Sequence, residues 1–108
     1  MKKVANCAFR RLVLIERKRT IVLFSSDLCY YCGDAKKVLN KIKKKTEGIE
    51  FIELDYIKDR NLALQYSVMF LPTVLFFEDG NVKGIIEGLK KKSRYYEKVS
   101  VIFNVKVK

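Results

Sequence analysis

The sequence predicts an α/β domain in which a central mixed sheet of about four to five strands carries helices on both faces. Three observations favour this fold class. Short apolar runs alternate with segments of helical periodicity, two of the runs flank an Asp-Gly turn, and 49% of the 108 residues are hydrophobic. Because a second core would leave too little apolar surface for each, we expect one domain over residues 1–108.

The N-terminal segment predicts a helix with Asn6 as its candidate N-cap. Its residues at helical spacing are Phe9, Leu12, Val13 and Glu16. The helix should end in the basic cluster 17–19. We expect Cys7 to be a small packing residue of this helix, with a third redox sulfur as the alternative. The apolar run Thr20–Phe24 then predicts a strand covered on both faces, which ends at residues 25–27.

The second helical pattern begins at Cys32 and continues to a glycine stop at Gly48. Its apolar face consists of Ala35, Val38, Leu39 and Ile42. Residues 49–54 alternate apolar and acidic side chains, which predicts a second strand. Either Asp59 or Asn61 can begin a short helix that continues to residue 66.

The C-terminal third predicts an antiparallel hairpin followed by a helix. Thr73–Phe77 and Val82–Ile86 are the two strands, and the turn 78–81 contains the Asp-Gly signal. After Gly88, helical spacing from about Lys91 predicts a closing helix, although several of its residues would also suit a strand. The residues at this spacing are Tyr95, Tyr96, Val99, Ile102 and Phe103.

The composition limits the classes of function. A formal charge of +11 favours acidic partners, but the lysines of 36–45 fall where a helix is solvated, so we do not expect nucleic acid as a partner. No apolar run reaches the roughly 18 residues of a membrane span, and charged residues interrupt any secretory segment at the N-terminus. We therefore expect a cytoplasmic monomer that makes no membrane contact. The absence of histidine excludes histidine bases and histidine metal ligands.

Cys29 and Cys32 form a C-x-x-C pair between a buried strand and a helix. Unpaired N–H groups and the helix dipole stabilise a thiolate at the first turn of a helix, which lowers the pKa of a thiol there. A structural zinc site needs four ligands, and Cys7 is the only further cysteine, although two chains could share a metal or an iron–sulfur cluster. Dithiol–disulfide exchange without a metal or cofactor is favoured over both a metal site and buried packing cysteines.

Pro72 is the only proline and opens an apolar strand. Proline is tolerated at this position because it need not donate to the ladder there. A tight turn before the strand can select a cis bond, and an ordinary trans proline is the alternative.

The succession of strand, C-x-x-C, helix, strand, helix, X-Pro-Thr, strand, Asp-Gly turn, strand, glycine and helix resembles the thioredoxin superfamily from about Thr20 to the C-terminus. The resemblance implies a thioredoxin-like fold and a thiol–disulfide oxidoreductase active in electron transport, which we expect to act as a reductase of protein disulfides. It makes Cys29 the attacking sulfur and Cys32 the resolving sulfur. It also implies a cis bond at Leu71–Pro72, beside the cysteines, where the loop would pair with the substrate backbone. Its implied partners are protein disulfides and a recycling reductase.

The sequence departs from the family pattern in several places. Thioredoxins usually have tryptophan before the first cysteine and Gly-Pro between the two, whereas this chain has Leu28 and Tyr30-Tyr31. Both tyrosines are candidate partner contacts, since exposed aromatic side chains bury much area on binding; covering the helix end is their alternative role. The family's buried acid on the preceding strand would fall at Leu23, and its helix proline is replaced by Lys37.

The missing acid leaves the proton of Cys32 without an obvious acceptor. We expect solvent to accept it first, with Asp27 or Asp34 as less favoured acceptors.

Three alternative functions remain open. They are a disulfide oxidase or isomerase, a glutaredoxin-like protein, and a non-enzymatic binding module that uses the basic surface. The glutaredoxin reading is weakened by Phe70-Leu71 before the proline and by residues 82–85, which lack the expected turn.

Overall fold

The computed structural model describes Met1 and residues 3–107, and its elements follow the predicted order. Four strands form one sheet in the order β2-β1-β3-β4. Their bounds are β1 Thr20–Ser25, β2 Glu50–Asp55, β3 Thr73–Glu78 and β4 Asn81–Glu87. β1 is parallel to β2, and β3 is antiparallel to both β1 and β4. The sheet is therefore mixed, as the sequence predicts.

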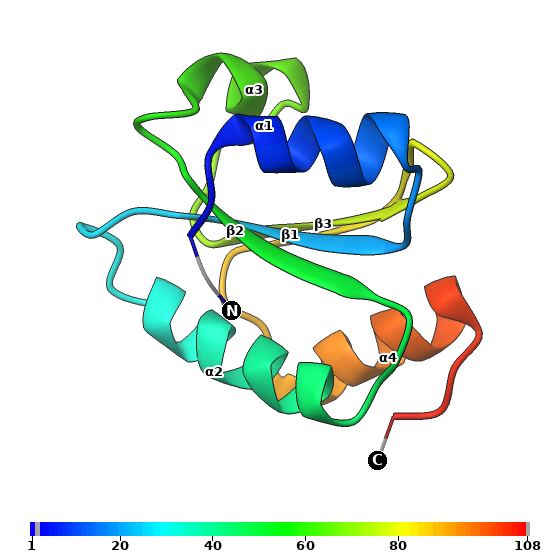
Figure 1. Ribbon diagram of the computed structural model, residues 1–108. Helices are drawn as coiled ribbons and strands as arrows, with labels where there is room; N and C mark the ends of the chain where they lie inside the picture. The colour runs from blue at the N-terminus through cyan, green and yellow to red at the C-terminus, as the bar shows by residue number, and fades with distance from the viewer. Residues whose placement is uncertain (2, 108) are drawn as a thin grey trace.

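Helices cover both faces of the sheet (Figure 1). α2 (Cys32–Lys44) and α4 (Lys92–Phe103) lie on one face. α1 (Asn6–Phe9), the π-helix η1 (Arg10–Ile15) and α3 (Arg60–Gln65) lie on the other. Among the residues that the structure describes, no helix is both long and apolar enough to cross a bilayer.

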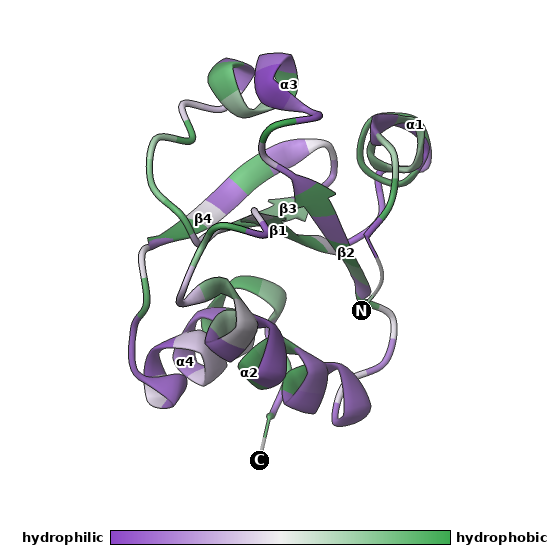
Figure 2. Ribbon diagram, turned by 90° about the vertical axis from the view of Figure 1, so that its left-hand side faces the viewer, coloured by the Kyte–Doolittle hydropathy of each residue, from purple (hydrophilic) through white to green (hydrophobic). Residues whose placement is uncertain are grey.

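Each face of the sheet buries its own apolar core, because successive strand residues point to opposite sides. On the α2/α4 side the strands contribute Ile21, Leu23, Phe51, Val74, Phe76 and Ile86. On the α1/α3 side they contribute Val22, Phe24, Ile52, Leu54, Leu75 and Phe77. Figure 2 shows β1 and β3 in green between the two helical layers. Every residue of β1 is buried, which confirms the prediction of a strand covered on both faces.

The N-terminal helix differs from its prediction in three respects. Its N-cap is Ala5 rather than Asn6, and no side chain of the described residues caps it. Its second half is a π-helix, whose Glu16 N–H donates to the carbonyl of Arg11, five residues back. Cys7 is exposed, so the expectation that it packs in the core is wrong, because the buried side chains of this helix lie on its other face.

Two features fix the ends of the sheet. At the β3–β4 turn, Asp79 and Gly80 both have positive φ, 57° and 83°, which is the backbone of the hairpin turn that Asp-Gly predicts. The N-terminal segment lies along β2, at the opposite edge of the sheet. There Lys3 forms a parallel bridge with Glu53, and the Val4 N–H donates to the Glu53 carbonyl at 2.9 Å.

Candidate active site

The two cysteines lie where the chain leaves β1 and enters α2. Cys29 and Cys32 form a disulfide with a Cα–Cα distance of 5.5 Å. Cys32 is the first residue of α2 and is 5% exposed, whereas Cys29 is half-buried. Cys29 is therefore the more accessible of the two cysteines, and Cys32 lies beneath the start of the helix.

A shallow surface groove adjoins the more exposed cysteine. It is lined by Ser26, Leu28, Cys29, Tyr30, Tyr31 and Leu71. The rings of Tyr30 and Tyr31 meet edge to face with centroids 4.9 Å apart. Tyr30 and Leu28 are 86% and 89% exposed. Apolar side chains of this size are seldom left so exposed in a cluster, which marks the groove as a contact surface.

The loop that contains Leu71 and Pro72, which is distant from the cysteines in the sequence, supplies the remaining wall of the groove. The Leu71–Pro72 peptide bond is cis. Leu71 lines the groove, while Pro72 is buried and its carbonyl accepts the Gly88 N–H at 2.7 Å. The loop is further closed by the Thr73 hydroxyl, which donates to the Phe70 carbonyl. Cys29, Tyr30, Tyr31 and Leu71 thus share one surface, and Pro72 supports it from behind.

The two acids considered as proton acceptors for Cys32 lie at the surface. Asp27 is 90% exposed and accepts a hydrogen bond from Lys3 Nζ at 2.9 Å, a contact that raises the pKa of Lys3. Asp34 is exposed in the first turn of α2. Leu23 is fully buried, so the position opposite the disulfide on β1 holds no carboxylate.

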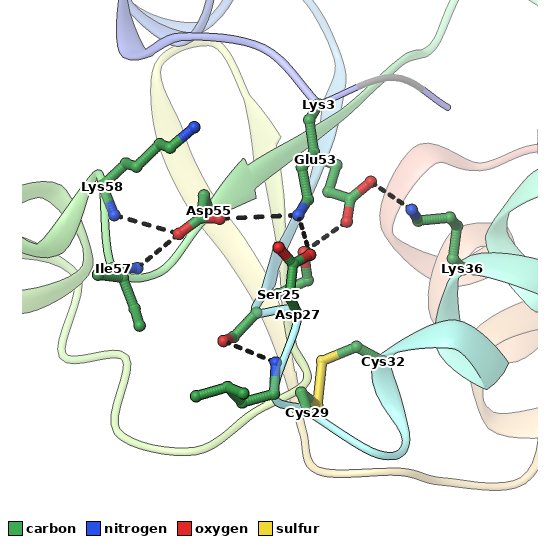
Figure 3. A network of polar contacts seen from close by, with 12 residues as sticks. Lys3, Ser25, Asp27, Cys29, Cys32, Lys36, Glu53, Asp55, Ile57 and Lys58 are labelled. Atoms are coloured by element: carbon green, nitrogen blue, oxygen red, sulfur yellow. Dashed lines mark hydrogen bonds and ion pairs between the residues drawn. A yellow bond between two sulfur atoms is a disulfide. The ribbon is translucent and has the colours of Figure 1, made fainter.

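A buried carboxylate nevertheless lies behind the disulfide, supplied by Glu53 on β2 (Figure 3). The Ser25 hydroxyl donates to Glu53 Oε2, and Lys36 Nζ lies 2.8 Å from Oε1. The sequence does not reveal this group, because Glu50 and Glu53 stand three residues apart in the strand, point to opposite faces, and give no sign of which one is buried. The feature that reveals the burial of Glu53 is the pairing register of β1 and β2, which places Glu53 beside Leu23.

A second carboxylate, Asp55, closes the end of β2 beside the same network. It accepts hydrogen bonds from the backbone N–H groups of Lys58 and Ile57, at 3.1 and 2.9 Å. These contacts, with the Lys58 bond the larger cause, lower the pKa of Asp55 despite its partial burial. Lys3 Nζ lies 3.6 Å from the same carboxylate and so joins Asp55 to Asp27.

Over residues 3–107 the structure holds no group of three cysteine, aspartate or glutamate side chains arranged to bind a metal ion. The redox-capable group that the structure does display is the Cys29–Cys32 disulfide itself.

Comparison with known proteins agrees with this geometry. The family model for thioredoxin matches residues 1–100. A thioredoxin of Mycoplasmoides gallisepticum is 24% identical over 82 residues, covering 76% of this chain and 82% of its own length. NADPH-dependent thioredoxin reductase 3 of Arabidopsis thaliana is 31% identical over 97 residues, which is 89% of this chain. This chain spans only 18% of that reductase.

Solved structures resemble the fold closely. A thioredoxin from Fasciola hepatica superposes with a TM-score of 0.82 at 20% identity, covering 94% of this chain and 97% of that one. A mutant thioredoxin from Halobacterium salinarum also gives 0.82, at 18% identity, covering 94% of this chain and 88% of that one. The predicted thioredoxin-like fold is confirmed.

Proposed function

Because this chain belongs to the thioredoxin family, whose members exchange thiols with disulfides, we propose that it acts in the reducing direction on protein disulfides. The observation that carries the proposal is the unequal exposure of the two cysteines at the groove. A half-buried Cys29 can be reached by a substrate disulfide, whereas a buried Cys32 is reached only by Cys29. Cys29 is then the attacking sulfur and Cys32 the resolving one.

The reaction proceeds in two exchanges. The Cys29 thiolate attacks a substrate sulfur, forms a mixed disulfide and expels the first substrate thiol. The Cys32 thiolate then attacks Cys29 Sγ, restores the disulfide seen here and expels the second substrate thiol. The protein loses two electrons and the substrate gains them.

Substrate contact is assigned to the residues around the groove. Tyr30 and Tyr31 offer aromatic area on one side of Cys29, and Leu71 lies on the other. Pro72 has no N–H, and the residue before it, Leu71, offers its backbone to an extended substrate segment. The disulfide is returned to the dithiol by a recycling reductase, for which the similarity to a thioredoxin reductase of Arabidopsis supplies the support. We place this reaction in the cytoplasm.

Reduction of insulin by dithiothreitol tests the proposal. The wild-type protein should accelerate it, the Cys29→Ser variant should not, and Cys7→Ser should match the wild type because Cys7 lies on a different helix. Wild-type protein that leaves the insulin rate unchanged would contradict the proposed function. The Cys32→Ser variant should accumulate a mixed disulfide on Cys29 that electrophoresis detects and dithiothreitol removes.

The direction of exchange needs a separate measurement. Equilibration of the Cys29–Cys32 pair with glutathione redox buffers yields its reduction potential. A value near that of thioredoxin, about −270 mV, supports a reductase, and one near about −120 to −180 mV indicates an oxidase or isomerase. A binding module without redox activity would retain its binding in the Cys29→Ser variant.

A further inference from the structure

Glu53 occupies an unusual place for a carboxylate. Its backbone pairs with Leu23 across the parallel β1–β2 ladder, and paired residues project their side chains to the same face of a sheet. That face is the one covered by α2, because Leu23 and its neighbour Phe51 belong to the α2/α4 core. Glu53 is only 1% exposed. Burial of an ionised carboxylate costs several kcal/mol unless it is paired, so its partners decide what it does.

Two side chains hold the carboxylate from opposite sides. Ser25, the last residue of β1, donates its hydroxyl proton to Oε2. Lys36 Nζ lies 2.8 Å from Oε1 in the geometry of an ion pair rather than of a hydrogen bond. Ser25 thus holds Oε2, and Lys36 holds Oε1. Lys3 adds a more distant positive charge from the N-terminal segment.

Both partners of Glu53 belong to the elements on either side of the C-x-x-C segment. Lys36 follows Cys32 by four residues on α2, so the two side chains lie on the same face of the helix, one turn apart. Ser25 ends the strand from which the chain turns into the C-x-x-C segment. Figure 3 shows Ser25 between Glu53 and the disulfide. The Lys36 side chain extends toward Glu53 from α2, the helix that begins at Cys32. Ser25 and Lys36 thus join the buried carboxylate to the strand and the helix that flank the C-x-x-C segment.

We propose that Glu53 is a positioning residue for the resolving step, and that its carboxylate, acting through the Ser25 hydroxyl, takes up the proton that Cys32 must lose. The proposal rests on the proposed function. It also replaces solvent, the acceptor that the sequence favours, with a group that the sequence does not reveal.

The resolving step begins with the proton of Cys32. The Cys32 thiol gives its proton to Ser25 Oγ as the Ser25 hydroxyl proton passes to Glu53. The Cys32 thiolate attacks Cys29 Sγ, the Cys29–Cys32 bond forms, and the bond from Cys29 to the substrate sulfur breaks. The substrate leaves as a thiolate and takes a proton from water. The Glu53 carboxylic acid returns its proton to solvent, and Lys36 stabilises the restored carboxylate.

The charged groups around Glu53 come from every element in contact with it. Lys36 faces it from α2 and Lys3 from the N-terminal segment, while the carboxylates of Asp27 and Asp55 contact Lys3. Both lysines place positive charge beside the carboxylate.

A two-phase stopped-flow experiment separates this role from the rest of the reaction. Reduced Cys7→Ser protein is mixed with an equimolar amount of dithiobis-nitrobenzoate, and the release of coloured thionitrobenzoate is followed. Attack by Cys29 releases the first equivalent and forms a mixed disulfide. Attack by Cys32 releases the second. Rates are measured from pH 6 to about pH 9.5, which spans the pKa of a free thiol at about 8.5.

The variant Glu53→Gln, made in the Cys7→Ser background, should slow the second phase by about 100-fold at pH 7 while leaving the first phase unchanged. The difference should narrow above about pH 8.5, where a thiol ionises without help. Glu53→Asp should restore part of the rate. Ser25→Ala should slow the same phase, and it keeps the test available if Glu53→Gln does not fold. Asp27→Asn and Asp34→Asn are matched controls, which should leave both phases unchanged.

Equal second-phase rates in Glu53→Gln and its parent at every pH would overturn the inference, as would an equal slowing of both phases. Neither result would touch the proposed function, which fails if the wild-type protein does not reduce insulin or if its reduction potential is that of an oxidase.

Discussion

The two helical layers of this protein treat their positive charges differently. In the Arg10–Arg19 segment, on the α1 side, four of five basic side chains lie within 4 Å of a carboxylate. They are Arg11, Arg17, Lys18 and Arg19. In the α2/α4 layer, taken as residues 32–45 and 88–107, twelve basic side chains accompany only Asp34 and Glu97. Of those twelve, among the described residues, only Lys36 has such a partner.

The difference shows that charge has separate uses on the two faces. On the α1 side, Arg17 and Arg19 bind Asp79 and Glu78 at the β3–β4 turn and so attach the end of the helix to the hairpin. On the α2/α4 side the cations are left to solvent or lie over an aromatic ring, as Lys45 and Lys92 do over Tyr96. The one paired lysine, Lys36, serves the buried carboxylate behind the disulfide. The unpaired charge is therefore available to partners.

The largest effect should come from removing one matched phenylalanine from each core. Phe9 and Phe103 are each 1% exposed and each contact a phenylalanine of β3. Replacement by alanine should cost about 3–5 kcal/mol of unfolding free energy in either case. Phe9→Ala should cost more, because Phe9 meets both Tyr66 and Phe77 edge to face, at 5.8 and 5.3 Å, whereas Phe103 meets Phe76 at 6.3 Å. Urea unfolding of both variants measures the order, and a costlier Phe103→Ala would reverse it.

A smaller effect should follow from the unpaired charge. At low salt, an acidic peptide disulfide should be reduced about tenfold faster than a basic one, because the positive field of the α2/α4 layer raises its encounter rate. The preference should fade by about 0.5 M salt, where screening is strong. The double variant Lys37→Gln/Lys41→Gln should lose part of it, whereas Arg10→Gln on the α1 side should not. Equal rates for both peptides at low salt would show that this face does not steer substrates.

The smallest effect concerns two tyrosines, one on each face. Burial raises the pKa of both Tyr95 and Tyr66, and for Tyr95 the Lys90 backbone partly opposes the rise. A raised pKa in the folded state means that stability is present below the unfolded pKa of about 10 and is lost as pH rises through the folded value. The unfolding free energy of the wild type should fall between pH 9 and about pH 11. Tyr95→Phe should reduce this fall more than Tyr66→Phe does, since Tyr95 is the more deeply buried.

The same two variants should differ little from wild type at pH 8. Among the described residues, no partner meets the Tyr95 hydroxyl in full hydrogen-bond geometry and the Lys90 backbone contacts it only weakly, so its removal should change the unfolding free energy by less than about 1 kcal/mol. Urea midpoints at pH 8 and at pH 10.5 provide both comparisons. A large destabilisation of Tyr95→Phe at pH 8 would mean that the hydroxyl is bound more tightly than the structure shows.

The fold was predictable because local signals agree with the global arrangement. Thr20–Phe24 is almost uniformly apolar and forms a strand that is buried on both faces. The Asp-Gly pair forms the hairpin turn. The cysteine pair was found for the same reason, since its spacing and its place before a helix are both local. Glu53 could not be found in this way. Its burial depends on α2, Ser25 and the N-terminal segment, which meet it only in three dimensions.

The exposure of Cys7 has a related cause. Helical spacing identified which residues of the N-terminal helix recur, but the face that meets the sheet is chosen by Phe9, Leu12 and Val13 together. The π-helical turn also changes the register of side chains along that helix, which a fixed period of 3.6 residues does not anticipate.

The contact between the N-terminal segment and β2 has a consequence for self-association. β2 and β4 are the outer strands of the sheet, and an open outer strand can pair with another molecule and seed aggregates. The bridge from Lys3 and the bond from Val4 occupy the free side of β2 at Glu53. On β4 the exposed charge of Lys83 hinders the same kind of pairing. Lys3 and Val4 thus protect the sheet from polymerising at the strand that carries the buried carboxylate.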